Sequence, residues 1–239
     1  FYSHDEEIQD FFESFDLAGR SHRPQENEDY FSLINWSTGG TKSEKYIEES
    51  IHHHTDIDSA GTITNTVTIK RKHTWNEDVL REWERILSQY GLSTYEAPGI
   101  LIDILGRGRN RTTNRIYVPA GSILMDSSSA DTETIYDADL KMTYFKTETE
   151  LNTGESSEIT LSYQLPFSLN LSQSADTYRL IAEKQPGTPG SLFTKSIQAD
   201  PSLKNLAFYP QKYSLDYQGN IVYPTNLVYD KYFAGVFAK

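Results

Sequence analysis

The stretch TITNTVTIKRKH, residues 62–73, alternates apolar and polar side chains more regularly than any other part of the chain. Ile63, Val67 and Ile69 fall on one face of an extended backbone, and the threonines at even positions from 62 to 68 fall on the other. Because side chains alternate across a strand, a period of two indicates a β-strand with one buried face. This segment is therefore predicted to be a strand.

Turn and strand signals extend outward from this segment in both directions. Asp58-Ser59-Ala60-Gly61 supplies turn chemistry between it and residues 46–56, so the two segments are predicted to pair as a hairpin. Residues 30–35 read as a further buried strand. In the second half, short β-type runs alternate with Gly- and Pro-containing turns, at residues 115–118, 138–148, 157–165, 177–184, 205–215 and 220–229. Such spacing favours a β-sandwich over alternating βαβ units.

Two helices are predicted on the N-terminal side. The first begins near Ser3, which forms a capping box with Glu6, and is expected to stop at Gly19. The second follows Asn76 as N-cap and ends at Gly91. It carries one apolar stripe, on which Trp83 is predicted to be core, and the stripe consists of Val79, Leu80, Trp83, Ile86, Leu87 and Tyr90.

The predicted fold class is all-β or β-dominated α+β. An antiparallel, immunoglobulin-like β-sandwich is expected in the C-terminal half, with the two helices near the N-terminal side. The domain division that follows places an N-terminal α+β portion at residues 1–106, as the end of a larger upstream domain, and the sandwich domain at residues 107–239.

Composition excludes several classes of function. The formal net charge of −12 disfavours nucleic-acid binding, which needs a cationic surface. The absence of cysteine excludes thiol nucleophiles, disulfides and cysteine-based metal sites. No apolar run approaches the roughly 20 residues that span a bilayer, so the chain is expected to be soluble. It begins with Phe1 rather than Met, which suggests a fragment of a longer protein.

Five segments together resemble one bacterial family. They are EDYFSLINWSTGGTKSEKYIEESI (residues 28–51), the hairpin that follows it, RIYVPAGSIL (115–124), LNTGESSEITLSYQLPF (151–167) and YRLIAEKQPGTPG (178–190). In this order they resemble the bacterial envelope proteins called domain of unknown function 4012. The chain departs from that family's pattern at residues 152–155, where Asn-Thr-Gly-Glu stands in place of Pro-Gly-Glu, and at Trp36, which is inserted after Asn35.

The resemblance implies a location outside the cytoplasm, at the cell surface. Members look like proteins with an N-terminal membrane helix and a preceding domain that faintly resembles the LytR-CpsA-Psr wall-polymer transferases. That domain is missing from this chain, so the resemblance leaves the activity undefined. The parent protein is accordingly expected to be membrane-anchored, with envelope components or an anionic wall polymer as partners.

One basic cluster stands out in this acidic chain, formed by Arg107, Arg109, Arg111 and Arg115. Guanidinium groups bind phosphate or carboxylate in a fixed, forked geometry, which suits an anionic polymer or headgroup. The alternative is that these arginines pair with the surplus acidic residues of the same protein. Trp36 is a second candidate ligand-binding residue, as a stacking platform for sugar, or else as a packed side chain that covers the neighbouring Gly-Gly turn.

Other chemical motifs are weak. His52 and His54 share a strand face opposite His53, but a metal site would need further ligands, so no metal and no cofactor are predicted. Residues 56–61 resemble the start of a calcium loop, but later ligand positions fail and a turn is favoured. No nucleophile motif is present, and no catalytic residue is predicted, although a Ser-His-Asp triad need not be contiguous in sequence.

The leading hypothesis is therefore a non-enzymatic envelope module that supports assembly or interaction. The first alternative is the accessory half of an enzyme that processes wall polymers or lipid-linked glycans, with its catalytic domain upstream. The second alternative is a carbohydrate-binding module that uses Trp36.

Overall fold

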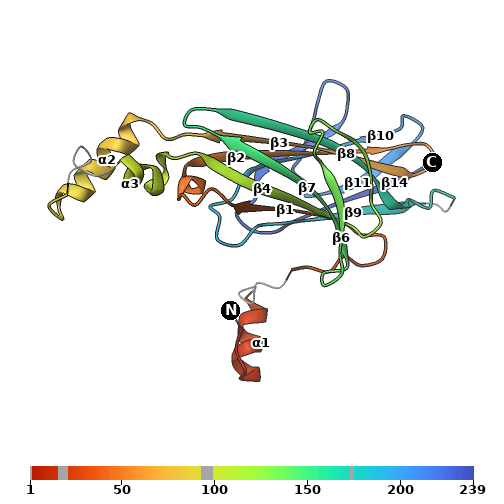
Figure 1. The fold of residues 1–239 in the computed structure, drawn as a ribbon. Coiled ribbons are helices and arrows are strands. Elements are labelled where there is room, and N and C mark those ends of the chain that lie inside the picture. Colours follow the sequence, from red (N-terminus) through yellow and green to blue (C-terminus); the bar gives the residue numbers. More distant parts are fainter. Residues whose placement is uncertain (1, 16–20, 93–98, 173–174) are drawn as a thin grey trace.

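The computed structural model describes residues 2–15, 21–92, 99–172 and 175–239. Two sheets pack face to face as a sandwich (Figure 1). Sheet A consists, in spatial order, of β11 (Lys204–Tyr209), β14 (Lys231–Ala238), β9 (Asp176–Glu183), β1 (Asp29–Ser37), β4 (Asn110–Val118), β7 (Met142–Leu151) and β6 (Glu133–Asp137). Sheet B consists of β12 (Ser214–Leu215), β13 (Ile221–Asn226), β10 (Leu192–Ala199), β2 (Ile47–Ile57), β3 (Thr62–His73), β8 (Ser156–Ser168) and β5 (Ile123–Ser127).

The predicted hairpin lies at the centre of sheet B. β2 and β3 pair antiparallel along their whole length, from Ile47 opposite His73 to Ile57 opposite Ile63. The turn is held by Asp58, whose Oδ1 accepts hydrogen bonds from the backbone N–H groups of Ala60 and Thr62, both at 2.8 Å. The period-two reading of this segment is confirmed, because its odd-numbered side chains are buried between the sheets.

The predicted sandwich is confirmed, and it extends beyond the C-terminal half. β1, β2 and β3 come from the first 106 residues; β1 lies between β9 and β4, and the β2–β3 pair lies between β10 and β8. Two neighbouring pairs, β1 with β9 and β2 with β10, run parallel, whereas the other pairs are antiparallel. Sequence periodicity identifies the buried face of a strand but carries no information about distant neighbours, which explains the difference.

Three α-helices lie outside the sandwich in the described chain. They are α1 (Glu6–Ser14), α2 (Glu77–Ser88) and the short α3 (Gly99–Ile102), which runs into the π-helical turn η2 (Asp103–Arg107). A 3-10 turn, η1 (Ser43–Tyr46), precedes β2. In Figure 1, α2 and α3 project from one end of the sandwich and α1 stands apart from it. None of these helices is long and apolar enough to span a membrane.

Details of the two predicted helices differ from expectation. The N-cap of α1 is Asp5 rather than Ser3, because the Asp5 carboxylate accepts from the N–H groups of Glu7 and Ile8. The expected stop at Gly19 lies outside the described residues. Asn76 is the N-cap of α2 as predicted, and Gly91 has the positive φ of +71° that its predicted capping role needs.

The prediction that Trp83 on the apolar stripe of α2 is core was wrong. No residue of α2 is buried, because the helix extends past the end of the sheets (Figure 1). Trp83 is half-buried and donates its Nε1–H to the Tyr46 hydroxyl at 2.7 Å. The buried tryptophan at this end is Trp75, which packs edge-on against the Tyr46 ring.

Candidate functional site

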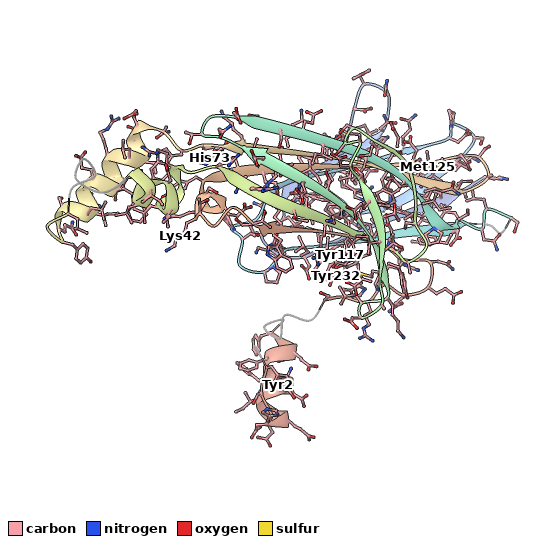
Figure 2. The ribbon with its side chains drawn as sticks, viewed as in Figure 1. Tyr2, Lys42, His73, Tyr117, Met125 and Tyr232 are labelled. Carbon is pink, nitrogen blue, oxygen red and sulfur yellow. The ribbon has the colours of Figure 1, made fainter. Side chains whose placement is uncertain are left out.

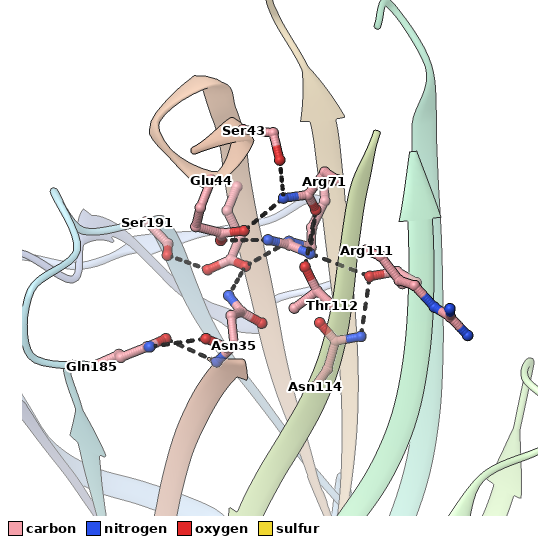
Figure 3. Close-up of polar contacts among 12 residues, drawn as sticks. Asn35, Ser43, Glu44, Arg71, Arg111, Thr112, Asn114, Gln185 and Ser191 are labelled. Atoms are coloured by element: carbon pink, nitrogen blue, oxygen red, sulfur yellow. Dashed lines mark hydrogen bonds and ion pairs between the residues drawn. The ribbon is translucent and has the colours of Figure 1, made fainter. Parts of the chain in front are cut away.

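A buried arginine lies between the sheets at the α2 end of the sandwich. Arg71 extends from the inner face of β3 and is 1% exposed. Its Nη2 donates to Glu44 Oε1 of η1 at 2.5 Å, and its Nε lies 3.2 Å from Glu49 Oε2 of β2 as an ion pair rather than an aligned hydrogen bond. A buried charge is tolerated only when it is paired, and the two carboxylates meet that requirement (Figure 3).

Amide and hydroxyl groups surround this ion cluster. Asn110 of β4 donates to Glu44 Oε2 at 2.9 Å and to the Ser43 hydroxyl at 3.1 Å. On the other side, Arg71 Nη1 donates to the Thr149 hydroxyl at 3.2 Å. The inner face of β4 is polar at this end of the sandwich, where it carries Asn110, Thr112 and Asn114 in place of apolar side chains. Figure 2 marks this end of the molecule by His73 and Lys42.

The loop after β9 is fixed to this cluster by a pair of amides. Gln185 Oε1 accepts from the Asn35 backbone N–H at 2.9 Å, and its Nε2 donates to the Asn35 carbonyl at 3.1 Å. At the far end of the loop, the Ser191 hydroxyl donates to Glu49 Oε1 at 2.6 Å. These contacts hold the Pro- and Gly-rich residues 186–190 beside Asn35 and Glu49.

Two adjoining cavities open at this position. The larger has a volume of about 820 Å³, and its lining includes Ser50, Lys70 and Leu192. The smaller is about 450 Å³ and includes Asn35, Glu44 and Lys45. They share Ile47, Glu49, Pro189, Gly190 and Ser191 as walls. We call the combined space the Glu49 groove.

One buried acceptor in the groove wall has no partner. Asn35 is 9% exposed, and its Nδ2 donates to Glu49 Oε2 at 2.6 Å, but its Oδ1 accepts no hydrogen bond. Leaving a buried polar atom unpaired costs about 1 to 3 kcal/mol. The oxygen itself has no accessible surface, so this unpaired acceptor lies within the wall rather than facing the cavity.

The predicted basic cluster runs from the end of η2 into β4. Arg107 donates to Asp103 at 2.7 Å, Arg109 donates to Glu150 at 2.6 Å, and Arg111 lies 3.9 Å from the same carboxylate. These three side chains are about half exposed. Their role in ligand binding stays a prediction.

Arg115 and Trp36 lie together on the outer face of sheet A. The Arg115 guanidinium lies 5.0 Å from the Trp36 ring centroid and 5.4 Å from the Tyr144 ring centroid. Trp36 is 57% exposed, so it does not cover the turn as a packed side chain. The structure thus brings Trp36 together with Arg115, but neither residue lines the Glu49 groove.

A second polar cavity, of about 430 Å³, lies on the outer face of sheet B. There the Ser196 hydroxyl lies 2.8 Å from His52 Nε2 and 2.7 Å from His54 Nδ1. His54 Nε2 in turn lies 3.3 Å from Asp56. The prediction that His52 and His54 share a face is confirmed, and His53 is buried on the opposite face.

The contacts in this cluster indicate which atom carries each proton. Asp56 favours a proton on His54 Nε2, so Nδ1 accepts the Ser196 proton, and a hydroxyl with one proton must then accept from His52. This is the order of a serine triad. However, Ser196 lies mid-strand, in register with His54 on one side and Val222 on the other, so its backbone belongs to the sheet rather than to an oxyanion hole.

Beneath these histidines, a fully buried network connects the two sheets. Lys195 Nζ bonds His53 Nδ1 at 3.1 Å and also contacts the Thr55 hydroxyl, which lies 3.0 Å from the Tyr178 hydroxyl. Tyr178 donates to Asp29 at 2.6 Å. Burial lowers the pKa of Lys195 to about 7, against the opposing effect of Asp29, and burial raises the pKa of Asp29 to about 6.

Among the described residues, no group of three or more His, Asp or Glu side chains is arranged to hold a metal ion. The carboxylates Glu44 and Glu49 are both engaged by Arg71.

Comparison with known proteins shows which fold the chain has but identifies no family. No family model and no curated protein matches the chain. Among solved structures, it is similar to a Legionella pneumophila protein described as a "putative nutrient binding protein", with 9% identity over 87% of this chain and 70% of that chain and a TM-score of 0.50. An M1 zinc metallopeptidase from Deinococcus radiodurans aligns with 11% identity over 80% of this chain and 42% of that chain, at a TM-score of 0.36. At these identities the first likeness shows the sandwich fold alone, and the second carries no argument.

Proposed function

We propose that this chain is a non-catalytic binding module on the outer face of a bacterial envelope, and that it binds a short polar segment of an envelope polysaccharide in the Glu49 groove. The observation that carries this proposal is the pair of adjoining cavities, whose wall is fixed by the hydrogen bond from Ser191 to Glu49 and by the paired amides of Asn35 and Gln185. The Arg71 ion cluster fixes the neighbouring carboxylates, so the wall is preorganised for a ligand.

The shape of the groove supports the same proposal. Its larger cavity, at about 820 Å³, is of the size that holds small ligands in other proteins. Its lining joins apolar residues, such as Ile47 and Leu192, to hydroxyl and charged groups. Apolar contact with a few fixed polar groups is the usual composition of a small-molecule site.

A blocking variant tests the groove. Ser50 lies on the outer face of β2 and lines the larger cavity without contributing to the Arg71 cluster, so Ser50→Trp is expected to fill the cavity while the fold is retained. Immobilised wild-type chain should retain polysaccharide from envelope extract, and Ser50→Trp should not. The control is Ser162→Trp on the same face of sheet B, in β8. Equal retention by wild type and Ser50→Trp would reject the groove as the binding site.

The location is tested separately. Protease added to intact cells of the source bacterium should cleave the parent protein within this segment, as detected with an antibody raised against the chain. Protection until the cells are lysed would contradict an extracytoplasmic location, whatever the groove binds.

A second candidate function rests on Ser196. In acyl transfer, Ser196 Oγ would attack an ester carbonyl while His54 takes its proton, the alcohol would leave with that proton, and water would then release the acid. Because Ser196 lies mid-strand, the oxyanion would have to be met by side-chain donors such as the Thr194 hydroxyl. Labelling by a fluorophosphonate probe, lost in Ser196→Ala, would support this candidate, and no labelling of the wild type would reject it.

A further inference from the structure

The four arginines that stand out in the sequence differ in their partners. Arg107, Arg109 and Arg111 each face a carboxylate, at distances of 2.7, 2.6 and 3.8 Å. Arg115 is half-buried on the outer face of sheet A, and no carboxylate of the described residues lies within ion-pair distance of it. A partly buried cation is costly unless other groups offset its charge. Arg115 is therefore the arginine of this group whose charge is left for a ligand.

Two aromatic rings hold the Arg115 side chain in place. The guanidinium carbon lies 5.0 Å from the Trp36 ring centroid and 5.4 Å from the Tyr144 ring centroid. Tyr144 packs in turn against Tyr117, with 4.9 Å between the ring centroids, in the apolar cluster on this face. Cation–π contact orients a guanidinium without using its hydrogen-bond donors. The Nε of Arg115 is a buried, unpaired atom, so an anion would be bound by the two terminal amino groups.

The charged groups around Arg115 already have partners of their own. The neighbouring ion pairs are Lys146 with Glu133, at 3.1 Å, and Arg111 with Glu148, at 3.8 Å. Asp137 accepts a hydrogen bond from the Tyr117 hydroxyl at 3.2 Å and bonds from two backbone N–H groups that follow it. An anion that binds to Arg115 therefore displaces none of these contacts.

Trp36 adds an apolar platform beside this cation. Its side chain is 57% exposed even though Arg115 packs against it, so much of the ring is open to a ligand. It lies on β1, one residue pair along from the pairing of Ile34 with Arg115, on the same face of sheet A. The apolar face of a sugar ring can pack on an exposed indole, and a guanidinium binds a carboxylate or phosphate through two parallel hydrogen bonds. This surface offers both contacts side by side.

From these contacts we infer that the outer face of sheet A binds an anionic saccharide, with the sugar ring on Trp36 and a carboxylate or phosphate on Arg115. Neither residue lines the Glu49 groove, so the inference does not depend on the proposed function. One stacked ring and one ion pair make a weak contact, so the retention of a polymer still depends on the groove. A neutral sugar would use Trp36 alone.

The test follows the indole N–H resonance of Trp36, assigned with Trp36→Phe, during titrations of the whole chain. The probes are glucuronate, its neutral methyl ester and a glucose phosphate. We expect an anionic probe to bind about tenfold more tightly than the ester, because only the anion engages Arg115. The anion that binds more tightly of the two identifies the group that Arg115 recognises.

Variants at the arginines isolate the charge. Arg115→Met keeps an apolar stem between the two rings and removes the guanidinium, so the affinity for the anion should fall to that for the ester. Arg109→Met is the matched control, because Arg109 is exposed and already paired with Glu150. If Arg115→Met fails to fold, added salt provides the same comparison in the wild type, where it should weaken binding of the anion and leave the ester unchanged.

The outcomes separate this surface from the groove. Equal affinities for the anions and the ester, or no shift of the Trp36 resonance, would overturn the inference. Loss of anion binding in Ser50→Trp would overturn it as well, because that variant changes the groove alone. Anion binding that persists in Ser50→Trp supports the Trp36 surface, whether or not that variant still retains envelope polysaccharide.

Discussion

Lys195 is a lysine in the centre of the sandwich, with no exposure to solvent. Burial lowers its pKa to about 7, whereas in the unfolded chain it takes its ordinary value near 10.5. Between these values the unfolded state binds a proton that the folded state does not, so the free energy of unfolding rises with pH.

The first prediction follows from that difference. Between about pH 7.5 and 9, the free energy of unfolding should increase by up to about 1.4 kcal/mol per pH unit, and Lys195→Met should remove most of this slope. Urea denaturation at several pH values measures it. The window stops below the pKa of tyrosine, because burial raises the pKa of Tyr163 and Tyr178, and their unfolded-state ionisation would reverse the trend. A flat wild-type profile would show that Lys195 stays charged when folded.

Arg71 gives a second prediction at this scale. Arg71→Met leaves Glu44 and Glu49 without their cation, and breaking a buried ion pair costs about 3 to 5 kcal/mol. Arg109→Met removes an exposed ion pair with Glu150, which is worth about 1 kcal/mol or less. Denaturation midpoints of the two variants provide the comparison. Similar losses would mean that the Arg71 cluster does not hold this end of the sandwich together.

The candidate site was only partly visible in the sequence. The alternation of Ile63, Val67 and Ile69 already places Arg71 on the buried face, although the run Lys70-Arg71-Lys72 looks like an exposed charged segment. The same parity argument, applied to Ile51, places Glu49 and His53 on the inner face of β2. The partners Glu44, Asn35 and Ser191 were not predictable, because they lie on elements that meet only through long-range contacts.

At the scale of elements, the β2–β3 turn depends on a glycine. Gly61 has a φ of +89°, and a Cβ atom there would lie 2.3 Å from the Leu169 carbonyl oxygen. The turn therefore needs both a left-handed backbone and close contact with the chain after β8, which only glycine allows.

Gly154 offers a matched control for a third prediction. Its φ is +83°, but a Cβ atom would have nothing within 4 Å. Gly154→Ala should cost only the strain of the left-handed backbone, about 1 to 2 kcal/mol, whereas Gly61→Ala should cost clearly more. Thermal denaturation of both variants measures the difference. Equal losses would imply that the Leu169 contact relaxes without cost.

Elements with strong local signals were predicted well. The hairpin and the capped start of α2 follow from turn residues, from period-two alternation and from Asn76. The environment of α2 did not follow, since an amphipathic stripe shows that a helix has a contact face but not how completely that face is covered. The parallel placement of β10 beside β2 joins residues about 140 positions apart, and no local pattern encodes it.

At the scale of the whole molecule, the sandwich places three polar regions in separate positions. The Glu49 groove opens at the α2 end, the Ser196 cavity lies on the outer face of sheet B, and Trp36 and Arg115 lie on the outer face of sheet A. Each region corresponds to a different candidate function, so the location of ligand binding distinguishes among them.

The most direct measurement is an amide chemical-shift map of the isotope-labelled chain, titrated with polysaccharide from the envelope. Binding in the groove predicts the largest shifts at residues 47–51 and 187–191, with Ser50→Trp abolishing them. Shifts centred on Trp36 and Arg115, or on His52 and Ser196, with residues 187–191 unchanged, would contradict the account.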